Sequence, residues 1–294
     1  MDGEFLTRPT AGEVLDLHEP AARRLPLVFA SPHSGSEYPA DFVAASRLDP
    51  LALRQSEDSF VDELFAAAPQ LGAPLLSARF PRAYLDVNRE AYELDPTMFS
   101  DALPSYVNAG SPRVRIGLGT IARIVASGEN IYAAKLRFAD AERRIECLYH
   151  PYHQVLRRLV QETAGMFGGY LLVDCHSMPS AAGGACGQEG ADIVLGDCYG
   201  AACAPRIIEA ACRFLADRGL KVAINAPYAG GFTTGFYGRP SAHCHALQIE
   251  INRALYMNER SYCRKPSFAR LVKDLAILIE RLGQATQDCL PKTA

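Results

Sequence analysis

The chain has 294 residues, of which 49% are hydrophobic and 21% are charged, and this composition is ordinary for a globular protein. Its 30 basic residues are set against 33 acidic residues, for a formal net charge of -3. Because no basic excess is present to neutralise a phosphate backbone, we expect no nucleic-acid partner. No apolar run approaches the roughly 20 residues needed to cross a bilayer, so we expect no membrane partner either.

The cysteines and the first residues of the sequence bear on the cellular compartment in which the protein is expected. The first twenty residues lack the basic and then apolar pattern of a signal peptide. The nine cysteines are scattered, odd in number and without a Cys-x-x-Cys pair. This pattern argues against a disulfide framework and against a zinc site made of thiolates. We therefore expect a cytoplasmic protein whose cysteines are mostly small buried side chains.

Strand-like apolar runs alternate with helical stretches along the whole sequence. In chain order, the expected elements are a strand at 25–30, a helix at 50–70, strands at 74–77 and 84–87, a long helical segment at 130–165 broken by Pro151, strands at 170–173 and 193–195, a helix ending at Asp217, strands at 221–225 and 246–251, and a closing amphipathic helix at 266–285. This alternation favours an α/β fold with three layers, in which helices cover both faces of a mostly parallel sheet. No linker or repeat marks a boundary, so we predict a single domain over residues 1–294.

Polar residues stand at or just beyond the ends of several predicted strands. His33 follows the strand at 25–30, His176 follows the strand at 170–173, and the pair Asn88 and Arg89 follows the strand at 84–87. Ligands of open α/β sheets bind beyond the carboxyl ends of the strands. Glu250 lies within the apolar run ALQIEI, where a carboxylate needs a partner such as a cation or a metal-bound water.

Two histidines and one carboxylate suit a catalytic zinc ion that keeps a fourth position for water. His33 and His176 are the candidate histidines, and manganese or cobalt would tolerate the same ligands. The acidic ligand remains open among Glu37, Glu57 and Asp58. The alternative interpretation of Glu57 and Asp58 is that they are acids that favour a helix N-terminus.

Arginines near the strand at 84–87 are candidates for substrate binding. Arg82 and Arg89 flank this strand, and a planar guanidinium can hold a substrate carboxylate through two parallel hydrogen bonds. The competing interpretation is an ion pair between Asp86 and Arg89, or a surface ion pair.

Two glycine-bearing segments are candidates for covering the site. The basic stretch at 113–123 lacks the residue order of a phosphate-binding loop, and we expect it to be a loop over the site in which Arg115 contacts the substrate. The stretch at 228–238 has the composition of a mobile lid. Among the other histidines, His150 and His153 are expected to pack or cap, and His243 and His245 are weaker candidates for ligands.

The sequence resembles the N-formylglutamate amidohydrolase family from about residue 25 to residue 280. The motifs that carry the resemblance stand in family order: His33 in SPHSGSEYP, Asp58 in QSEDSFVDELF, DVNRE at 86–90, RIGLG at 115–119, IY at 131–132, PYH at 151–153, DCHSMP at 174–179 and LQIEINRALYMNE at 247–259. The resemblance implies a phosphorylase/hydrolase-like fold related to the zinc carboxypeptidases and aspartoacylases. It also implies hydrolysis of N-formyl-L-glutamate to formate and glutamate, the last step of one route of histidine degradation.

Carried over to matching positions, the resemblance implies His33, Asp58 and His176 as metal ligands and Glu250 as the general base. It implies that Asn88 and Arg89 hold a substrate carboxylate. Family members often have Thr-Asp where this chain has Glu57 and Asp58, so which of the two acids binds the metal stays open.

Together, these residues predict metal-dependent cleavage of an amide in a small-molecule substrate. The ion would lower the pKa of its bound water and polarise the carbonyl. Glu250 would take the proton from the water and pass it to the leaving amine, while Arg82 or Arg115 would stabilise the oxyanion.

Three other functions are compatible with parts of this sequence pattern. A cysteine hydrolase that uses Cys175 and His176 is disfavoured because neighbours on an extended strand point to opposite faces. A non-catalytic binding protein with the same fold and a carboxypeptidase acting on peptides are the other two.

Overall fold

The computed structural model of the chain describes residues 11–183 and 190–291. The first ten residues and Cys186, which contributed to the prediction of the compartment, lie outside this part. The described chain divides into two compact units. Unit 1 contains Gly35–Glu57 and Ala78–Val155 with the N-terminal segment that ends at Asp16, and unit 2 contains Leu17–Ser34, Asp58–Ser77 and the chain from Leu156 onwards. The single domain over residues 1–294 stays a prediction, since two compact units can belong to one domain.

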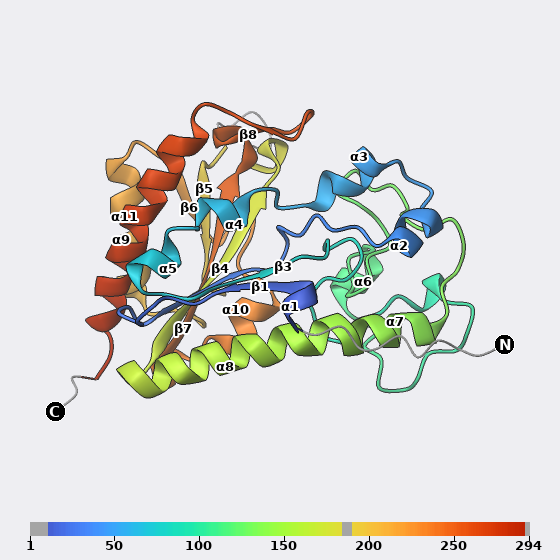
Figure 1. Cartoon of the computed structure of the whole chain (residues 1–294), viewed down its shortest axis with the longest axis horizontal. Coiled ribbons are helices and arrows are strands. Elements are labelled where there is room, and N and C mark those ends of the chain that lie inside the picture. Colours follow the sequence, from blue (N-terminus) through green and yellow to red (C-terminus); the bar gives the residue numbers. More distant parts are fainter. Residues whose placement is uncertain (1–10, 184–189, 292–294) are drawn as a thin grey trace. The chain divides into compact units, whose positions relative to one another are not determined.

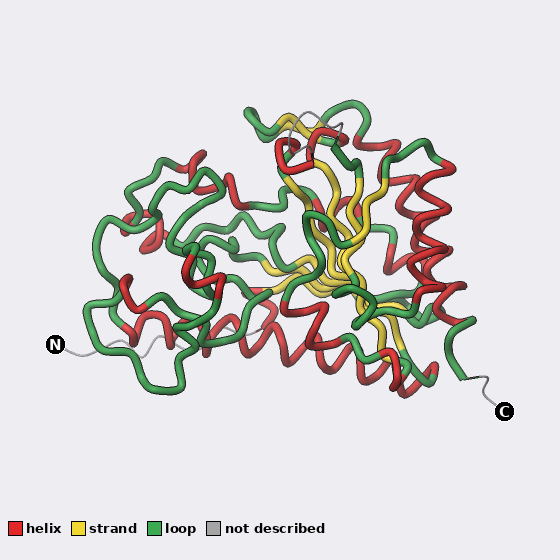
Figure 2. The backbone as a smooth tube through the Cα atoms, turned by 180° about the vertical axis from the view of Figure 1, so that it is seen from behind, coloured by secondary structure: helices red, strands yellow, loops and turns green. Residues whose placement is uncertain are grey.

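A seven-stranded sheet is the framework of the fold and carries the strands drawn in yellow in Figure 2. Its order is β1-β3-β2-β4-β7-β5-β6. The pairs β2–β3, β2–β4, β4–β7 and β5–β6 are parallel, and β5 runs antiparallel to β7. The strands are β1 (Leu15–His18), β2 (Leu27–Ser31), β3 (Leu75–Ala78), β4 (Tyr170–Met178), β5 (Ile193–Gly196), β6 (Val222–Ile224) and β7 (Cys244–Asn252), and a separate hairpin pairs β8 (Met257–Asn258) with β9 (Cys263–Arg264). This mostly parallel mixed sheet with helices around it confirms the predicted α/β fold.

The helices vary widely in length. They are α1 (Ala11–Val14), α2 (Ala40–Ala45), α3 (Pro50–Leu53), α4 (Val61–Leu64), α5 (Ala68–Leu71), α6 (Pro112–Arg115), α7 (Phe138–Arg144), α8 (His150–Phe167), α9 (Pro205–Asp217), α10 (Phe232–Tyr237) and α11 (Phe268–Gln287). In unit 2, α9 and α11 lie side by side (Figure 1), and α10 packs against β4 and β7.

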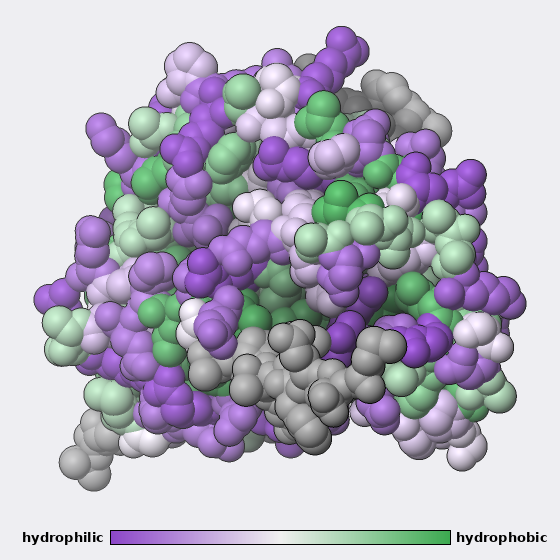
Figure 3. All heavy atoms as spheres, turned by 45° about the vertical axis from the view of Figure 1, so that its right-hand side comes forward, coloured by the Kyte–Doolittle hydropathy of each residue, from purple (hydrophilic) through white to green (hydrophobic). Residues whose placement is uncertain are grey.

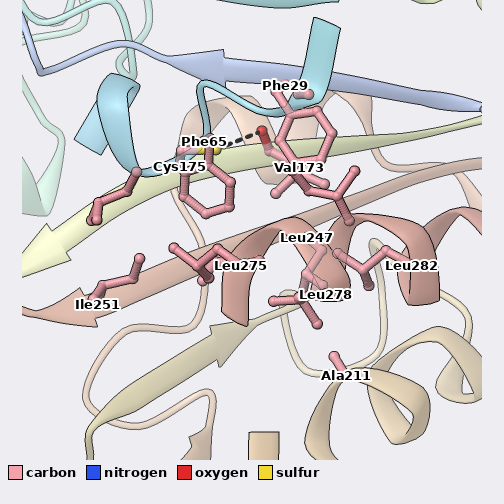
Figure 4. Close-up of a cluster of buried hydrophobic side chains, with 14 of the residues drawn as sticks. Phe29, Phe65, Val173, Cys175, Ala211, Leu247, Ile251, Leu275, Leu278 and Leu282 are labelled. Atoms are coloured by element: carbon pink, nitrogen blue, oxygen red, sulfur yellow. Dashed lines mark hydrogen bonds between the residues drawn. The ribbon is translucent and has the colours of Figure 1, made fainter. Parts of the chain in front are cut away.

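The main core lies between the sheet and helices α4, α5, α9 and α11. Alternate residues of the strands, such as Phe29, Val173 and Leu247, belong to the same buried cluster as the leucines of α11 (Figure 4). Burying one side chain of this size contributes about 1.5–3 kcal/mol. Because strand side chains alternate between faces, the residues between these core positions face the other side of the sheet. That alternation separates the packing positions from the polar positions described below.

Most strands of unit 2 were predictable from their apolar runs. The strands expected at 25–30, 74–77, 170–173, 193–195, 221–225 and 246–251 are confirmed as β2 to β7, and β4 and β7 are longer than expected. The helices expected to end at Asp217 and to span 266–285 are confirmed as α9 and α11. The helical segment expected at 130–165 is confirmed only from Phe138 onwards, and residues 130–137 are not helical. It passes through a π-helical turn at Ile145–Tyr149 into α8. Pro151 does not break the segment as expected, because it lies in the first turn of α8, where a proline is tolerated.

Two further local predictions are wrong. Residues 84–87 form a turn and irregular backbone instead of a strand. The backbone N–H groups of Tyr84 and Leu85 donate to the carbonyl of Pro81 in a local turn, so they do not pair with a neighbouring strand. Residues 50–70 contain α3, α4 and α5 with a 3-10 turn instead of one helix. Phe60 interrupts them with a left-handed φ of 67°, which no residue inside an α-helix adopts.

Polar and apolar side chains are interspersed over the face of the molecule drawn in Figure 3. Within residues 11–183 and 190–291, no helix is both long enough and apolar enough to cross a membrane.

Candidate metal centre

The sheet brings His33 and His176 to the same end of two neighbouring parallel strands. β2 and β4 are paired in parallel, His33 follows the end of β2, and His176 lies near the carboxyl end of β4. The third strand, β7, places Glu250 directly beside His176 in the parallel register. Partners in a parallel register point to the same face, so the imidazole and the carboxylate lie on one side of the sheet.

Three ligand atoms converge at this end of the sheet. Nδ1 of His33 lies 3.1 Å from Nδ1 of His176. Oδ2 of Asp58 lies 3.0 Å from the His176 nitrogen and 3.3 Å from the His33 nitrogen. All three side chains are buried. A hydrogen bond from the Asp58 backbone N–H to the His33 carbonyl, 3.0 Å long, ties the two loops together.

Protons alone cannot satisfy this triangle. A ring nitrogen carries either a hydrogen or a lone pair, never both, and a carboxylate only accepts. At most two of the three contacts can therefore be hydrogen bonds at one time. In the third contact, either two N–H groups or two lone pairs face each other and repel. A single cation shared by three lone pairs would satisfy all of them. Two ligands of one tetrahedral zinc ion stand about 3.3 Å apart, which fits the observed spacing. The buried group of His33, Asp58 and His176 could thus hold a metal ion.

The structure separates the three acids between which the sequence could not decide. Asp58 is the acid that lies against both histidines. Glu57 is engaged instead by Arg54, whose Nε lies 3.0 Å from its Oε1, and by the hydroxyl of Tyr38 at 2.7 Å. Glu37 is exposed and forms an ion pair with Arg79 at 2.6 Å. Of these three carboxylates, Asp58 is therefore the one available to the candidate centre.

A second layer of polar groups surrounds the triangle. Asp174, fully buried on β4, contacts Nε2 of His176 at 3.0 Å through its Oδ1. Ser177 donates a 3.0 Å hydrogen bond to Oδ1 of Asp58, and Nη2 of Arg253 donates one of 3.2 Å to the same oxygen. A carboxylate behind a histidine ring fixes the orientation of the ring and raises its basicity.

These contacts shift the pKa values of two members of the triangle. Burial acts to lower the pKa of His176, but its attraction to Asp174, Asp58 and Glu250 is stronger, and the pKa is raised well above its usual 6.5. Burial acts to raise the pKa of Asp58, but hydrogen bonds and attraction to His176 and His33 outweigh it and hold the pKa well below 3.8. The Asp58 side chain is therefore an ionised acceptor at neutral pH.

Glu250 is buried on β7, and its immediate neighbour fixes its position. Nε2 of Gln248 donates a 2.8 Å hydrogen bond to Oε1 of Glu250. The two residues are separated by one position along β7, so they share a face. The carboxylate is thereby held beside the triangle as a potential proton acceptor.

The candidate substrate-binding residues lie in unit 1. Arg89 is buried and donates to the carbonyls of Leu118 and Asn88 at 2.8 and 2.7 Å. Burial lowers its pKa, and the carboxylate of Asp86 opposes this effect. Asp86 lies 2.8 Å from Arg82 and 3.5 Å from Arg89, so the ion pair considered from the sequence is present.

The remaining predicted residues have different surroundings. Arg115 is exposed at the end of α6. Nε2 of His153 contacts the carbonyl of Val87 at 2.9 Å, which agrees with a packing role. Cys175 is buried in the apolar core on the opposite face of β4 from His176, and burial raises the pKa of its thiol well above 9.0. A buried, protonated thiol that faces away from the imidazole is unsuited to act as a nucleophile.

Sequence reasoning missed Asp174, Ser177 and Arg253 as members of this site. A local signal existed for two of them, because Asp174 and Ser177 flank the candidate ligand His176 at the end of an apolar strand. No comparable signal existed for Arg253, whose contact with Asp58 joins residues 195 positions apart.

Comparisons with known proteins identify relatives that match most of the chain. The family model described as N-formylglutamate amidohydrolase matches residues 25–257. An N-formylglutamate deformylase of Pseudomonas putida is 29% identical over 84% of this chain and 86% of the relative. The N-formylglutamate deformylase of Pseudomonas aeruginosa is 28% identical over 81% of this chain and 84% of the relative.

Solved structures share the fold. The crystal structure of an N-formylglutamate amidohydrolase from Ralstonia eutropha JMP134 matches with a TM-score of 0.88 and 38% identity, covering 94% of this chain and 99% of the other. The gene product Atu2144 of Agrobacterium tumefaciens, 18% identical, matches with a TM-score of 0.65 over 92% of this chain and 95% of the other. At 18% identity, the similarity to Atu2144 concerns the fold alone.

Proposed function

Because the chain belongs to the N-formylglutamate amidohydrolase family, we propose that it hydrolyses N-formyl-L-glutamate to formate and L-glutamate. The observation that carries this proposal is the convergence of His33, Asp58 and His176 beside Glu250. Two relatives named N-formylglutamate deformylase, aligned over more than four fifths of the chain, support the choice of substrate.

The proposal includes one divalent metal ion held by His33, Asp58 and His176. Two imidazoles and a carboxylate are a common ligand set of catalytic zinc, and manganese or cobalt are the alternatives. When bound, such an ion lowers the pKa of water toward neutrality and polarises a carbonyl oxygen.

Glu250 is proposed as the general base and then the general acid. Its carboxylate would accept a proton from the attacking water and return that proton to the amine of the leaving glutamate. The hydrogen bond from Gln248 to Oε1 supports this role, because it fixes the plane of the carboxylate before substrate binds.

Recognition of the substrate is assigned to Asn88, Arg89 and Arg115. A guanidinium matches a carboxylate through paired, charge-assisted hydrogen bonds. The fixed position of Arg89, which donates to two backbone carbonyls, supports a rigid recognition element. Arg82 is proposed to stabilise the oxyanion of the tetrahedral intermediate.

The proposed substrate suggests a metabolic role, and the cysteines suggest a cellular location. Release of glutamate from its N-formyl derivative would serve histidine degradation. The eight free cysteines of the described residues support a cytoplasmic location, where thiols stay reduced.

The proposal is tested by metal analysis together with a substrate panel. The purified protein would be assayed with N-formyl-L-glutamate, N-acetyl-L-glutamate, N-formyl-L-aspartate and a peptide with a C-terminal glutamate, before and after exhaustive chelation. We expect the highest kcat/KM with N-formyl-L-glutamate, loss of turnover on chelation, and recovery with zinc. Turnover that survives chelation would remove the metal from the mechanism.

The same panel separates the alternative functions. Preference for the peptide would identify a carboxypeptidase, and preference for another N-acyl amino acid would identify a different deacylase. Binding of these compounds without any turnover would identify a non-catalytic binding protein.

A further inference from the structure

The two oxygens of the Asp58 carboxylate have different surroundings. Oδ2 faces the ring nitrogens of His33 and His176 at 3.3 and 3.0 Å. Oδ1 accepts hydrogen bonds from Ser177 at 3.0 Å and from Arg253 at 3.2 Å. One oxygen is thus directed at the candidate metal position, and the other is held by protein donors.

The polarity of this network is fixed by chemistry. A guanidinium only donates, so Nε of Arg253, 3.1 Å from Oγ of Ser177, must donate to that hydroxyl. An ionised carboxylate only accepts hydrogen bonds, so the hydroxyl of Ser177 must donate its hydrogen bond to Asp58. Arg253 therefore holds Oδ1 twice, once directly through Nη2 and once through Ser177.

The segment that carries Arg253 is itself anchored to the segment that carries Asp58. Arg253 begins a 3-10 turn (Arg253–Leu255) directly after β7, and the Asn252 side chain caps this turn by accepting the Ala254 N–H. Three residues further on, the buried hydroxyl of Tyr256 donates to the carbonyl of Ser59 at 3.0 Å. Two separate contacts thus join the segment after β7 to the segment before α4: Arg253 binds Asp58, and Tyr256 binds Ser59.

We infer that Arg253 and Ser177 are positioning residues that restrict Asp58 to ligation through one oxygen. The inference rests on the proposed metal site. With Oδ1 engaged by two donors, a cation at the triangle meets Oδ2 alone, and a coordination position stays open for water or substrate. Without these donors the carboxylate can rotate and bind the ion through both oxygens, which would fill that position.

The experiment uses Zn²⁺ and Co²⁺ as probes and does not depend on turnover. The variants are Ser177→Ala, Arg253→Met and Arg253→Lys, and the control is Arg23→Met. Arg23 is a suitable match because its side chain is 8% exposed, as is that of Arg253, and it pairs with Glu162 in the same unit. Zinc affinity is measured by competition with a chromophoric chelator, and coordination number by the visible spectrum of the Co²⁺-loaded protein.

We expect Arg253→Met to weaken Zn²⁺ binding about 10–100-fold, the usual effect of removing a group that orients a ligand. Ser177→Ala should weaken it less. In both variants the Co²⁺ bands should lose intensity, as expected for a change from four to five ligands, while Arg23→Met leaves affinity and spectrum unchanged. Arg253→Lys keeps the positive charge, but a single ammonium group cannot reproduce the two contacts of the guanidinium with Oδ1 of Asp58 and Oγ of Ser177. This variant should therefore resemble Arg253→Met.

Two outcomes would overturn the inference, and they are distinguishable. If wild-type protein binds Zn²⁺ and the variants bind it within threefold with the same Co²⁺ spectrum, the positioning role is wrong while the proposed metal site stands. If wild-type protein takes up neither ion, the metal site and the positioning role both fall. Should Arg253→Met fail to fold, Ser177→Ala decides the question, because it removes a single hydroxyl.

Discussion

Replacement of Glu250 by glutamine tests the proposed base with little change in shape. The side chain keeps its length and keeps an oxygen that can accept the 2.8 Å hydrogen bond from Gln248. The substitution removes the negative charge and the capacity to take up a proton at neutral pH. Since β7 is buried and paired on both sides by β4 and β5, the fold should tolerate this isosteric change.

The expected loss of activity can be worked from the role assigned to Glu250. A positioned general base contributes about 10²–10⁴ in rate, which corresponds to about 2.7–5.5 kcal/mol of transition-state stabilisation. Glu250 is not among the three converging ligand residues His33, Asp58 and His176. The affinity for Zn²⁺ should therefore change less than tenfold, even though one nearby negative charge is lost.

The assay measures formate release from N-formyl-L-glutamate by zinc-loaded wild-type protein and by the Glu250→Gln variant, with zinc content determined on the same samples. Glu280→Gln is the control, because this glutamate lies on the exposed side of α11, and it should keep wild-type kcat. A Glu250→Gln variant that is fully loaded with zinc and retains more than a tenth of wild-type kcat would show that the proton acceptor is another group.

Three further predictions concern residues with different roles. Asp174→Asn should weaken Zn²⁺ affinity about 10–100-fold in chelator competition, because the carboxylate behind His176 no longer orients the ring; unchanged affinity would contradict this role. Arg89→Ala should raise KM for N-formyl-L-glutamate about 10–100-fold, the effect of losing charged hydrogen bonds of about 1.5–3 kcal/mol, and an unchanged KM would refute it. Desolvation, assisted by the charge of His243, lowers the pKa of His245 from 6.5 to about 4. Because the unfolded chain then binds a proton that the folded chain does not, the free energy of unfolding should decrease as the pH falls from 6.5 toward 4, by up to about 3 kcal/mol. Urea unfolding at neutral and acidic pH would measure this decrease, which should be smaller in a His245→Leu variant.

The fold was predictable where apolar runs determine the structure. Strands β2, β4 and β7 are buried along nearly their whole length. Each contains a short group of apolar residues, such as LVFA in β2 and YLLV in β4, that indicates a buried strand. The segment at 50–70 was not predictable in the same way. Its helical spacing is real, but Asp49 caps a short helix by accepting the Ala52 N–H, and the left-handed Phe60 begins a new one. Side-chain contacts of this kind override a periodic pattern.

The candidate site was predictable only as far as strand ends could be recognised. His33, His176 and Glu250 stand out because each is polar at the end of, or within, an apolar strand. The acidic ligand could not be chosen from the sequence, because Glu57 and Asp58 are adjacent and both precede a helix. Contacts between side chains separate them: Arg54 engages Glu57, and the two imidazoles engage Asp58.

Electrostatic balance gives an independent reason to assign a cation to this centre. Asp58, Asp174 and Glu250 are buried carboxylates of unit 2, and Arg253 is the buried guanidinium that contacts them through Asp58. Histidines that bind a metal ion are neutral. With both imidazoles in that form, the three carboxylates and the one guanidinium carry a formal charge of -2 between them, which one divalent ion would offset. Burying charge costs several kcal/mol per ion, and apolar replacements of buried ion pairs are often more stable. A purely structural role would therefore favour apolar side chains at these positions, and we infer that the charges are retained for the binding of a cation.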